Sequence, residues 1–90
     1  MATIRLPNTL RPLCGGHGEV VVEADVLGAA LDALESAHPG FAERVLTVDG
    51  QLQGFVNVFI DGTECRQLDG LGSAVTAGSV ITIVAAVAGG

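Results

Sequence analysis

The chain has 90 residues, 49% of them hydrophobic, which is enough apolar material for the core of one small domain. Its formal net charge is −6, it contains no lysine, and its four arginines form no basic run. This composition disfavours nucleic-acid binding, because that function needs clustered cations to neutralise phosphates. The N-terminus shows no signal-peptide pattern, and the uncharged residues 71–90 are too few and too polar for a membrane span. We therefore expect a cytoplasmic protein that binds neither nucleic acid nor membranes.

The first half of the chain predicts two strands and one helix. Residues 3–6 alternate between apolar and polar side chains, and residues 19–24 contain a β-branched run, so both segments are expected to be strands. Proline and glycine mark the loop of residues 7–18 between them. Asp25 is a good N-cap for the following helix, which ends at Pro39-Gly40. Its apolar side chains recur with the spacing of one helical face: Leu27, Ala30, Leu31 and Leu34.

The second half predicts one further helical turn and three strands. Residues 41–46 could form the turn, and residues 55–60 form a strand followed by Asp61-Gly62, which is a hairpin signal. Residues 63–66 would be the short return strand, and residues 80–86 the last strand. The order β-β-α-β-β-β predicts an α+β protein with a β-grasp (ubiquitin-like) fold. We expect a mixed sheet of four to five strands with one main helix packed on one face, and the first and last strands paired in its middle.

The sheet face opposite the helix is the expected docking surface. If Val56, Val58 and Ile60 point to the helix, strand alternation places Asn57 and Phe59 on the other face. The same alternation places Thr82 and Val84 outward on the last strand, and Arg5 outward on the first. We expect Phe59 to lie beside Val84, and we predict that four residues bind a partner: Phe59, Val84, Thr82 and Arg5. A face that is partly covered and binds no partner is the alternative.

The chain stops at Ala88-Gly89-Gly90, directly after the last predicted strand. We expect a β-grasp domain over residues 1–86 and a flexible tail over residues 87–90. Glycine has no Cβ, so Gly89 and Gly90 could enter a channel that is too narrow for other side chains, with Val87 and Ala88 also contacting the partner. The reactive group would then be the terminal carboxylate of Gly90, although a frayed chain end is the simpler reading of a terminal glycine pair.

A carboxylate must be activated before it reacts with a nucleophile. Coupling to AMP supplies a leaving group, which sulfide or a persulfide can displace to give a thiocarboxylate. The sequence contains no phosphate-binding G-x-x-x-x-G-K-[ST] motif, so we expect no cofactor bound by this chain, and a partner must supply the ATP-dependent step.

Two cysteines, Cys14 and Cys65, make no disulfide framework and match no metal motif, so no metal site is expected. A structural role for Cys14 is favoured over a reactive thiol, because no cation is assured beside it. Cys65 is expected to be a half-buried hydrophobe on a short strand. His38, before Pro39, is expected to lie at the helix end, where it favours the helix dipole.

The order of elements, the DGTEC turn and the ending SVITIVAAVAGG resemble the MoaD/ThiS family of ubiquitin-like sulfur carriers. The resemblance covers essentially the whole chain. It implies an E1-like adenylating enzyme of the MoeB/ThiF type that uses ATP, and a thiocarboxylate on Gly90. TLRPLCGG, FVNVFIDG and AVAGG are most similar to the carriers of a cysteine-biosynthesis pathway. Such a carrier passes its sulfur to a PLP-dependent cysteine synthase and is recycled by a metalloprotease.

Other functions remain open on the sequence. In the favoured reading the chain is a protein co-substrate and has no catalytic activity of its own. It could instead be a ubiquitin-like modifier attached to targets through Gly90, or a MoaD-like small subunit of molybdopterin synthase. A third possibility is a β-grasp interaction domain with an incidental glycine end.

Overall fold

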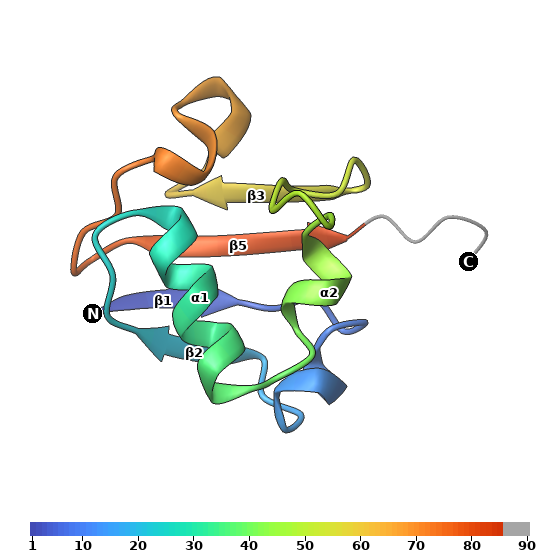
Figure 1. Cartoon of the computed structure of the whole chain (residues 1–90). Coiled ribbons are helices and arrows are strands. Elements are labelled where there is room, and N and C mark those ends of the chain that lie inside the picture. The colour runs from blue at the N-terminus through green and yellow to red at the C-terminus, as the bar shows by residue number, and fades with distance from the viewer. Residues whose placement is uncertain (86–90) are drawn as a thin grey trace.

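The strands pair into one mixed sheet (Figure 1). A computed structural model describes residues 1–85, and within them the strand order is β2-β1-β5-β3-β4. The strands are β1 (Ala2–Arg5), β2 (Glu19–Val22), β3 (Val56–Ile60), β4 (Thr63–Glu64) and β5 (Val80–Ala85). β1 and β5 run parallel to each other in the middle, and each other pair of neighbours is antiparallel. The predicted β-grasp fold, including the central pairing of the first and last strands, is confirmed.

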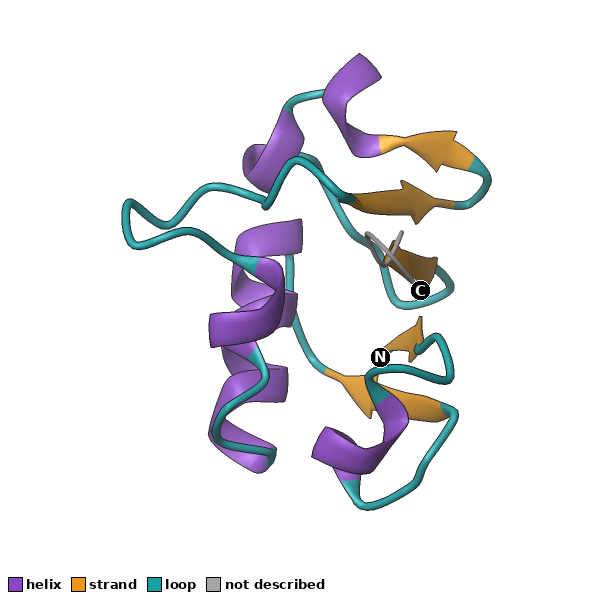
Figure 2. Cartoon of the chain, turned by 90° about the vertical axis from the view of Figure 1, so that its right-hand side faces the viewer, coloured by secondary structure: helices purple, strands orange, loops and turns teal. Residues whose placement is uncertain are grey.

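The main helix, α1 (Leu27–Ala37), covers one face of this sheet, and Figure 2 shows it on one side of the strands. Its predicted apolar stripe is fully buried, with exposed fractions of 0–2% for Leu27, Ala30, Leu31 and Leu34. From the sheet, β3 contributes Val56, Val58 and Ile60 to the same core, and β5 contributes Ile81 and Ile83. The predicted inward and outward faces of both strands are therefore confirmed.

The start of α1 differs from the prediction. The N-cap is Val26 rather than Asp25, and no side chain caps the first turn. Instead, the N–H of Leu27 donates to the carbonyl of Ser73 at 2.9 Å, and the carbonyl of Asp25 accepts from the N–H of Val75 at 2.8 Å. The loop before β5 thus supplies an acceptor for one of the first N–H groups of the helix, which have no partner within the helix itself.

The end of α1 is tied to a second short helix, α2 (Ala42–Val45), which confirms the expected extra turn. His38 is the C-cap of α1, as predicted. The Glu35 carboxylate accepts hydrogen bonds from the N–H of Ala42 at 2.7 Å and of Gly40 at 3.1 Å. Donation by Ala42 first, and then by Gly40, holds the pKa of Glu35 below its usual value.

Local geometry near the turns confirms one prediction and corrects others. Asp61 and Gly62 have φ angles of 50° and 90°, which is the two-residue hairpin turn that the Asp-Gly pair predicted. The return strand is shorter than expected, because the chain turns into a 3-10 helix at Cys65–Gln67. Cys65 is therefore not half-buried on a strand but wholly buried at a helix start. The predicted loop of residues 7–18 contains a second 3-10 helix, Arg11–Cys14.

The expected domain boundary after residue 86 and the expected tail, residues 87–90, lie outside the described residues. Within residues 1–85, no helix is long and apolar enough to cross a membrane.

Candidate functional site

The sheet face opposite α1 carries a row of side chains that crosses all the strands described above. Adjacent strands place Glu19 opposite Arg5, Arg5 opposite Thr82, Thr82 opposite Phe59, and Phe59 opposite Glu64. We call this face, with its residues Arg5, Glu19, Asn57, Phe59, Glu64, Thr82 and Val84, the open face. It contains the four side chains for which the sequence predicts partner binding, from three different strands.

The open face is apolar at its centre and charged at its sides. Val84 is 44% exposed although it is a valine on a central strand, and Phe59 is half-buried. On one side, Arg5 Nε lies 3.2 Å from Glu19 Oε2. Both of these side chains are more than half exposed, so water screens the pair and it adds little to stability. The arrangement of an accessible apolar centre within a polar rim is typical of a surface that docks a partner.

The register of β3 and β5 corrects one expectation. Val84 lies directly opposite Asn57, and Phe59 lies directly opposite Thr82. Phe59 is thus a diagonal neighbour of Val84 rather than its direct partner. Diagonal side chains on one sheet face are still within reach of an aromatic ring, so the two residues belong to one surface.

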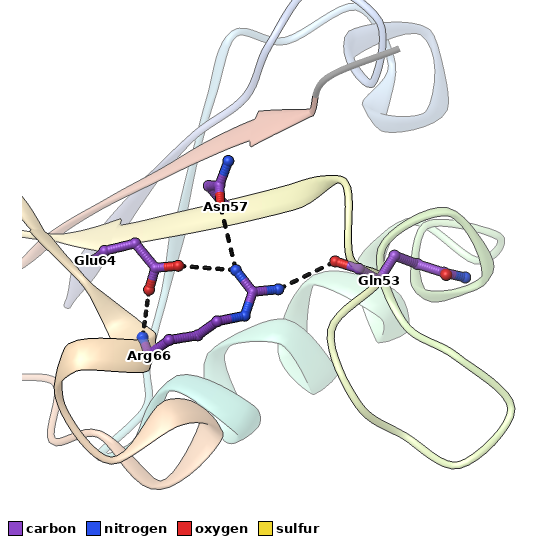
Figure 3. A network of polar contacts seen from close by, with 4 residues as sticks. All are labelled: Gln53, Asn57, Glu64 and Arg66. Atoms are coloured by element: carbon purple, nitrogen blue, oxygen red, sulfur yellow. Dashed lines mark hydrogen bonds and ion pairs between the residues drawn. The ribbon is translucent and has the colours of Figure 1, made fainter. Parts of the chain in front are cut away.

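An arginine that the sequence analysis did not place in the site holds the edge of this face (Figure 3). Arg66 Nη1 donates to Glu64 Oε1 at 2.8 Å and to Asn57 Oδ1 at 3.2 Å. Its Nη2 donates to the Gln53 carbonyl at 3.1 Å, which ties the start of β3 to the segment after β4. The N–H of Arg66 also bonds to Glu64 Oε2. In the sequence, the Glu64-x-Arg66 spacing was the available indication of the ion pair. The contacts of the guanidinium with Gln53 and Asn57 arise only in the fold.

The Arg66 network affects both charge and shape beside Val84. Donation from the Arg66 N–H, reinforced by the guanidinium, holds the pKa of Glu64 below its usual value. Because Asn57 is the register partner of Val84, the bond from Arg66 positions the polar side chain next to the exposed valine. Arg66 therefore orders the rim of the open face near the end of β5.

The two thiols are buried, although Cys65 stands between Glu64 and Arg66 in the chain. Cys14 and Cys65 are each 0% exposed, and burial raises the pKa of both thiols. A thiol in this state is a poor nucleophile, since the thiolate is the reactive form. Among the described residues, no group of three or more His, Cys, Asp and Glu side chains could hold a metal ion.

The residues predicted to react or to contact the partner at the chain end follow β5. Ala85, the last described residue, pairs with Val56 at the end of the sheet that also carries Val84. Val87, Ala88, Gly89 and Gly90 lie outside the described residues. What the structure defines is the rigid surface from which this segment continues.

Comparison with known proteins shows the family to which this chain belongs. The model of the ThiS family matches residues 4–90. The chain belongs to the ThiS family.

Individual members of similar sequence and structure agree with this assignment. The sulfur carrier protein CysO of Mycobacterium tuberculosis is 38% identical over 90 residues, which cover 98% of this chain and 97% of the relative. A chain of the Amycolatopsis orientalis BexX/CysO complex superimposes with a TM-score of 0.93 at 32% identity, covering 100% of both chains. The small archaeal modifier protein 1 of Haloferax volcanii is 39% identical over 78 residues, covering 83% of this chain and 85% of the relative. This ThiS-family chain is thus similar to sulfur carriers over nearly its whole length.

Proposed function

We propose that this chain is a sulfur carrier protein whose reacting group is the C-terminal carboxylate of Gly90. The similarity to CysO over 98% of the chain is the observation that carries the proposal, together with a family match that extends through residue 90. The chain acts as a protein co-substrate, and its partners do the catalysis.

The chemistry requires two steps on the same carboxyl carbon. A carboxylate oxygen of Gly90 attacks the α-phosphorus of ATP and pyrophosphate leaves, which gives an acyl adenylate. A sulfide or persulfide sulfur then attacks the carbonyl carbon and AMP leaves with the bonding electron pair. With sulfide the product is the thiocarboxylate directly, and with a persulfide the remaining S–S bond must be reduced. The sequence has no phosphate-binding motif and no lysine, so an E1-like adenylating enzyme binds the ATP.

The tail carries the reacting group, but conformational entropy prevents it from supplying the binding affinity. A chain end that contains two glycines loses conformational freedom when it enters an enzyme, and this loss opposes binding. Gly90 is the fifth residue after Ala85, so a fully extended segment reaches at most about 18 Å beyond the last described residue. The affinity must therefore come from the rigid surface next to this segment. The open face, with Phe59, Thr82 and Val84 at its centre, is where we place the activating enzyme.

A cysteine-type pathway is the favoured destination of the sulfur, because the relatives with the widest coverage are named CysO. In such a pathway a PLP-dependent synthase accepts the sulfur, and a metalloprotease releases the carrier for another cycle. The small archaeal modifier protein 1 of Haloferax volcanii superimposes less closely, with a TM-score of 0.78 against 0.93 for the chain of the CysO complex, so attachment to proteins is the less favoured function. A role as the small subunit of molybdopterin synthase is also less favoured.

Intact mass spectrometry tests the proposal. The protein is incubated with an E1-like enzyme, ATP and a sulfide source, and its mass is expected to rise by the difference between one sulfur and one oxygen atom. Deletion of Gly90 should abolish the rise. An equal rise in the shortened protein would overturn the assignment of the site. Conjugates of higher mass in a lysate, formed without any thiocarboxylate, would favour the modifier.

A further inference from the structure

The two edges of the sheet are built differently. β4, at one edge, has two residues and turns at once into a 3-10 helix, so it offers almost no free backbone. β2, at the other edge, has four residues (lower edge of the sheet in Figure 1). Its central residue on the outward face, Val21, is 57% exposed. An edge strand of this kind is a template for a further strand unless something blocks it.

The backbone groups that face away from the sheet can be identified from the register of β1 and β2. Leu6 N–H donates to the Gly18 carbonyl at 2.8 Å, so Leu6 and Gly18 are a bonded pair of the ladder. Bonded and non-bonded pairs alternate along an antiparallel ladder. The pairs Val20 with Ile4 and Val22 with Ala2 are therefore bonded, and the N–H and C=O groups of Glu19 and Val21 point outward. Within residues 1–85, no other strand pairs with this edge.

Charge determines which strand this edge can accept. Glu19 and Glu23 stand two residues before and after Val21, so all three side chains share one face if the alternation continues past Val22. A second copy paired antiparallel about Val21 would place Glu19 opposite Glu23 twice. Like charges directly opposite are destabilising, so self-pairing is disfavoured. A strand with a cation on each side of an apolar residue would instead form two favourable cross-strand pairs.

The arginines near β2 do not remove the preference of this edge for a strand that carries cations. Arg5 is paired with Glu19, but both side chains are exposed and Glu19 keeps a second carboxylate oxygen. Arg11 Nε donates to the Leu6 carbonyl at 3.0 Å and lies near Gly18, at the start of β2. The Glu23 end of the strand has no ion pair among the described residues.

We propose that the free edge of β2 binds an extended, basic segment of a partner protein by strand addition, and that Glu19 and Glu23 form ion pairs with its cations. Backbone groups of Glu19 and Val21 supply the hydrogen bonds, and the two carboxylates supply the selectivity. The hydrogen bonds would form along the outer edge of β2, two strands away from β5, and not over Phe59, Thr82 and Val84, where we place the activating enzyme.

A pair of synthetic peptides tests the proposal on the full-length protein. Each peptide is a nine-residue β-branched sequence with a central valine, flanked two residues away on both sides by lysine in one and by glutamate in the other. In an amide NMR titration, the lysine peptide should shift the signals of Glu19 and Val21, and the shift should weaken as salt is added. The glutamate peptide should bind at least about tenfold more weakly.

Two variants separate backbone pairing from mere charge attraction. Val21→Pro removes an outward N–H that the fold does not use, so the protein should fold but lose peptide binding. Val21→Thr keeps the N–H and the β-branch, and it should bind as the parent does. Equal binding of both peptides, unchanged binding by Val21→Pro, or shifts confined to β3 and β5 would each overturn the proposal. So would a dimer held through β2 in sedimentation equilibrium.

Discussion

Phe59 on β3 and Thr82 on β5 lie directly opposite each other at the centre of the open face. Arg5 flanks Thr82 on the other side, and Glu64 flanks Phe59. The apolar centre is completed diagonally by Val84, which stands opposite Asn57. A partner that covers Phe59 therefore also covers Val84, so the two side chains form one apolar contact surface.

Val84→Asp is expected to weaken binding of the activating enzyme by more than about 2 kcal/mol, or roughly 30-fold, because a buried charge would replace an apolar contact. Folding should be nearly unaffected, since Val84 is 44% exposed in the free protein. Calorimetric titration with the enzyme and a melting curve measure the two effects. Val48→Asp is the matched control: it makes the same change at a fully exposed residue outside the open face. Unchanged affinity of Val84→Asp would mean that the enzyme docks elsewhere.

Gly89→Val is expected to block adenylation and leave the melting temperature unchanged. The β-branched side chain stiffens the chain and would clash in a narrow enzyme channel. Pyrophosphate release with the activating enzyme gives the rate of activation, and a melting curve gives the stability. If Gly89→Val were activated as fast as the parent, the channel would have to be wide enough for a valine.

The double variant Cys14→Ser, Cys65→Ala should still accept sulfur at the terminus, because the proposed carrier atom is the main-chain carboxyl carbon. Both thiols are wholly buried with raised pKa values, so the native parent should also react only slowly with a thiol reagent. Mass spectrometry after the activation reaction checks the first point. Some loss of stability is expected from placing a hydroxyl in the core. Loss of sulfur acceptance by Cys14→Ser alone, with the fold intact, would identify that thiol as a relay.

Glu35→Gln is expected to lower stability near neutral pH and to matter less in acid. Hydrogen bonds from Ala42 and Gly40 depress the pKa of Glu35 in the folded state, so the folded chain binds this proton less readily than the unfolded chain. The stabilisation is fully present above the unfolded pKa and disappears as the pH falls through the folded pKa. Denaturation curves near pH 7 and in acid, for parent and variant, measure the difference. Asp32→Asn makes the same chemical change at an exposed residue of the same helix and is the matched control.

Phe41→Ala is expected to destabilise the fold by about 3–5 kcal/mol, because it empties the largest fully buried side-chain site. Phe55→Ala is the matched control: Phe55 is 46% exposed, and its truncation should cost no more than about 1 kcal/mol. Chemical denaturation measures both. A similar cost for the two variants would contradict the placement of Phe41 at the junction of α1 and α2.

Local patterns in the sequence determined the elements and their faces. The spacing of Leu27, Leu31 and Leu34 defined the buried stripe of α1, and the Asp61-Gly62 pair defined the hairpin turn. Alternation along residues 56–60 and 80–84 correctly assigned Phe59, Thr82 and Val84 to the outward face. These features depend on chain periods of 3.6 and 2 residues and on the φ angles of single residues, so a short window of sequence contains them.

Only the tertiary structure decided which residues meet across those elements. Alternation places Val84 and Phe59 on one face but leaves open whether Val84 lies opposite Asn57 or Phe59, since a shift of two residues preserves both faces. The N-cap moved to Val26 because Ser73, far along the chain, supplies the carbonyl that accepts from Leu27. Likewise, Arg66 reaches Gln53 and Asn57 only because β3 and β4 pair. Contacts between distant segments are set by how the whole core packs, and no local period in the sequence encodes them.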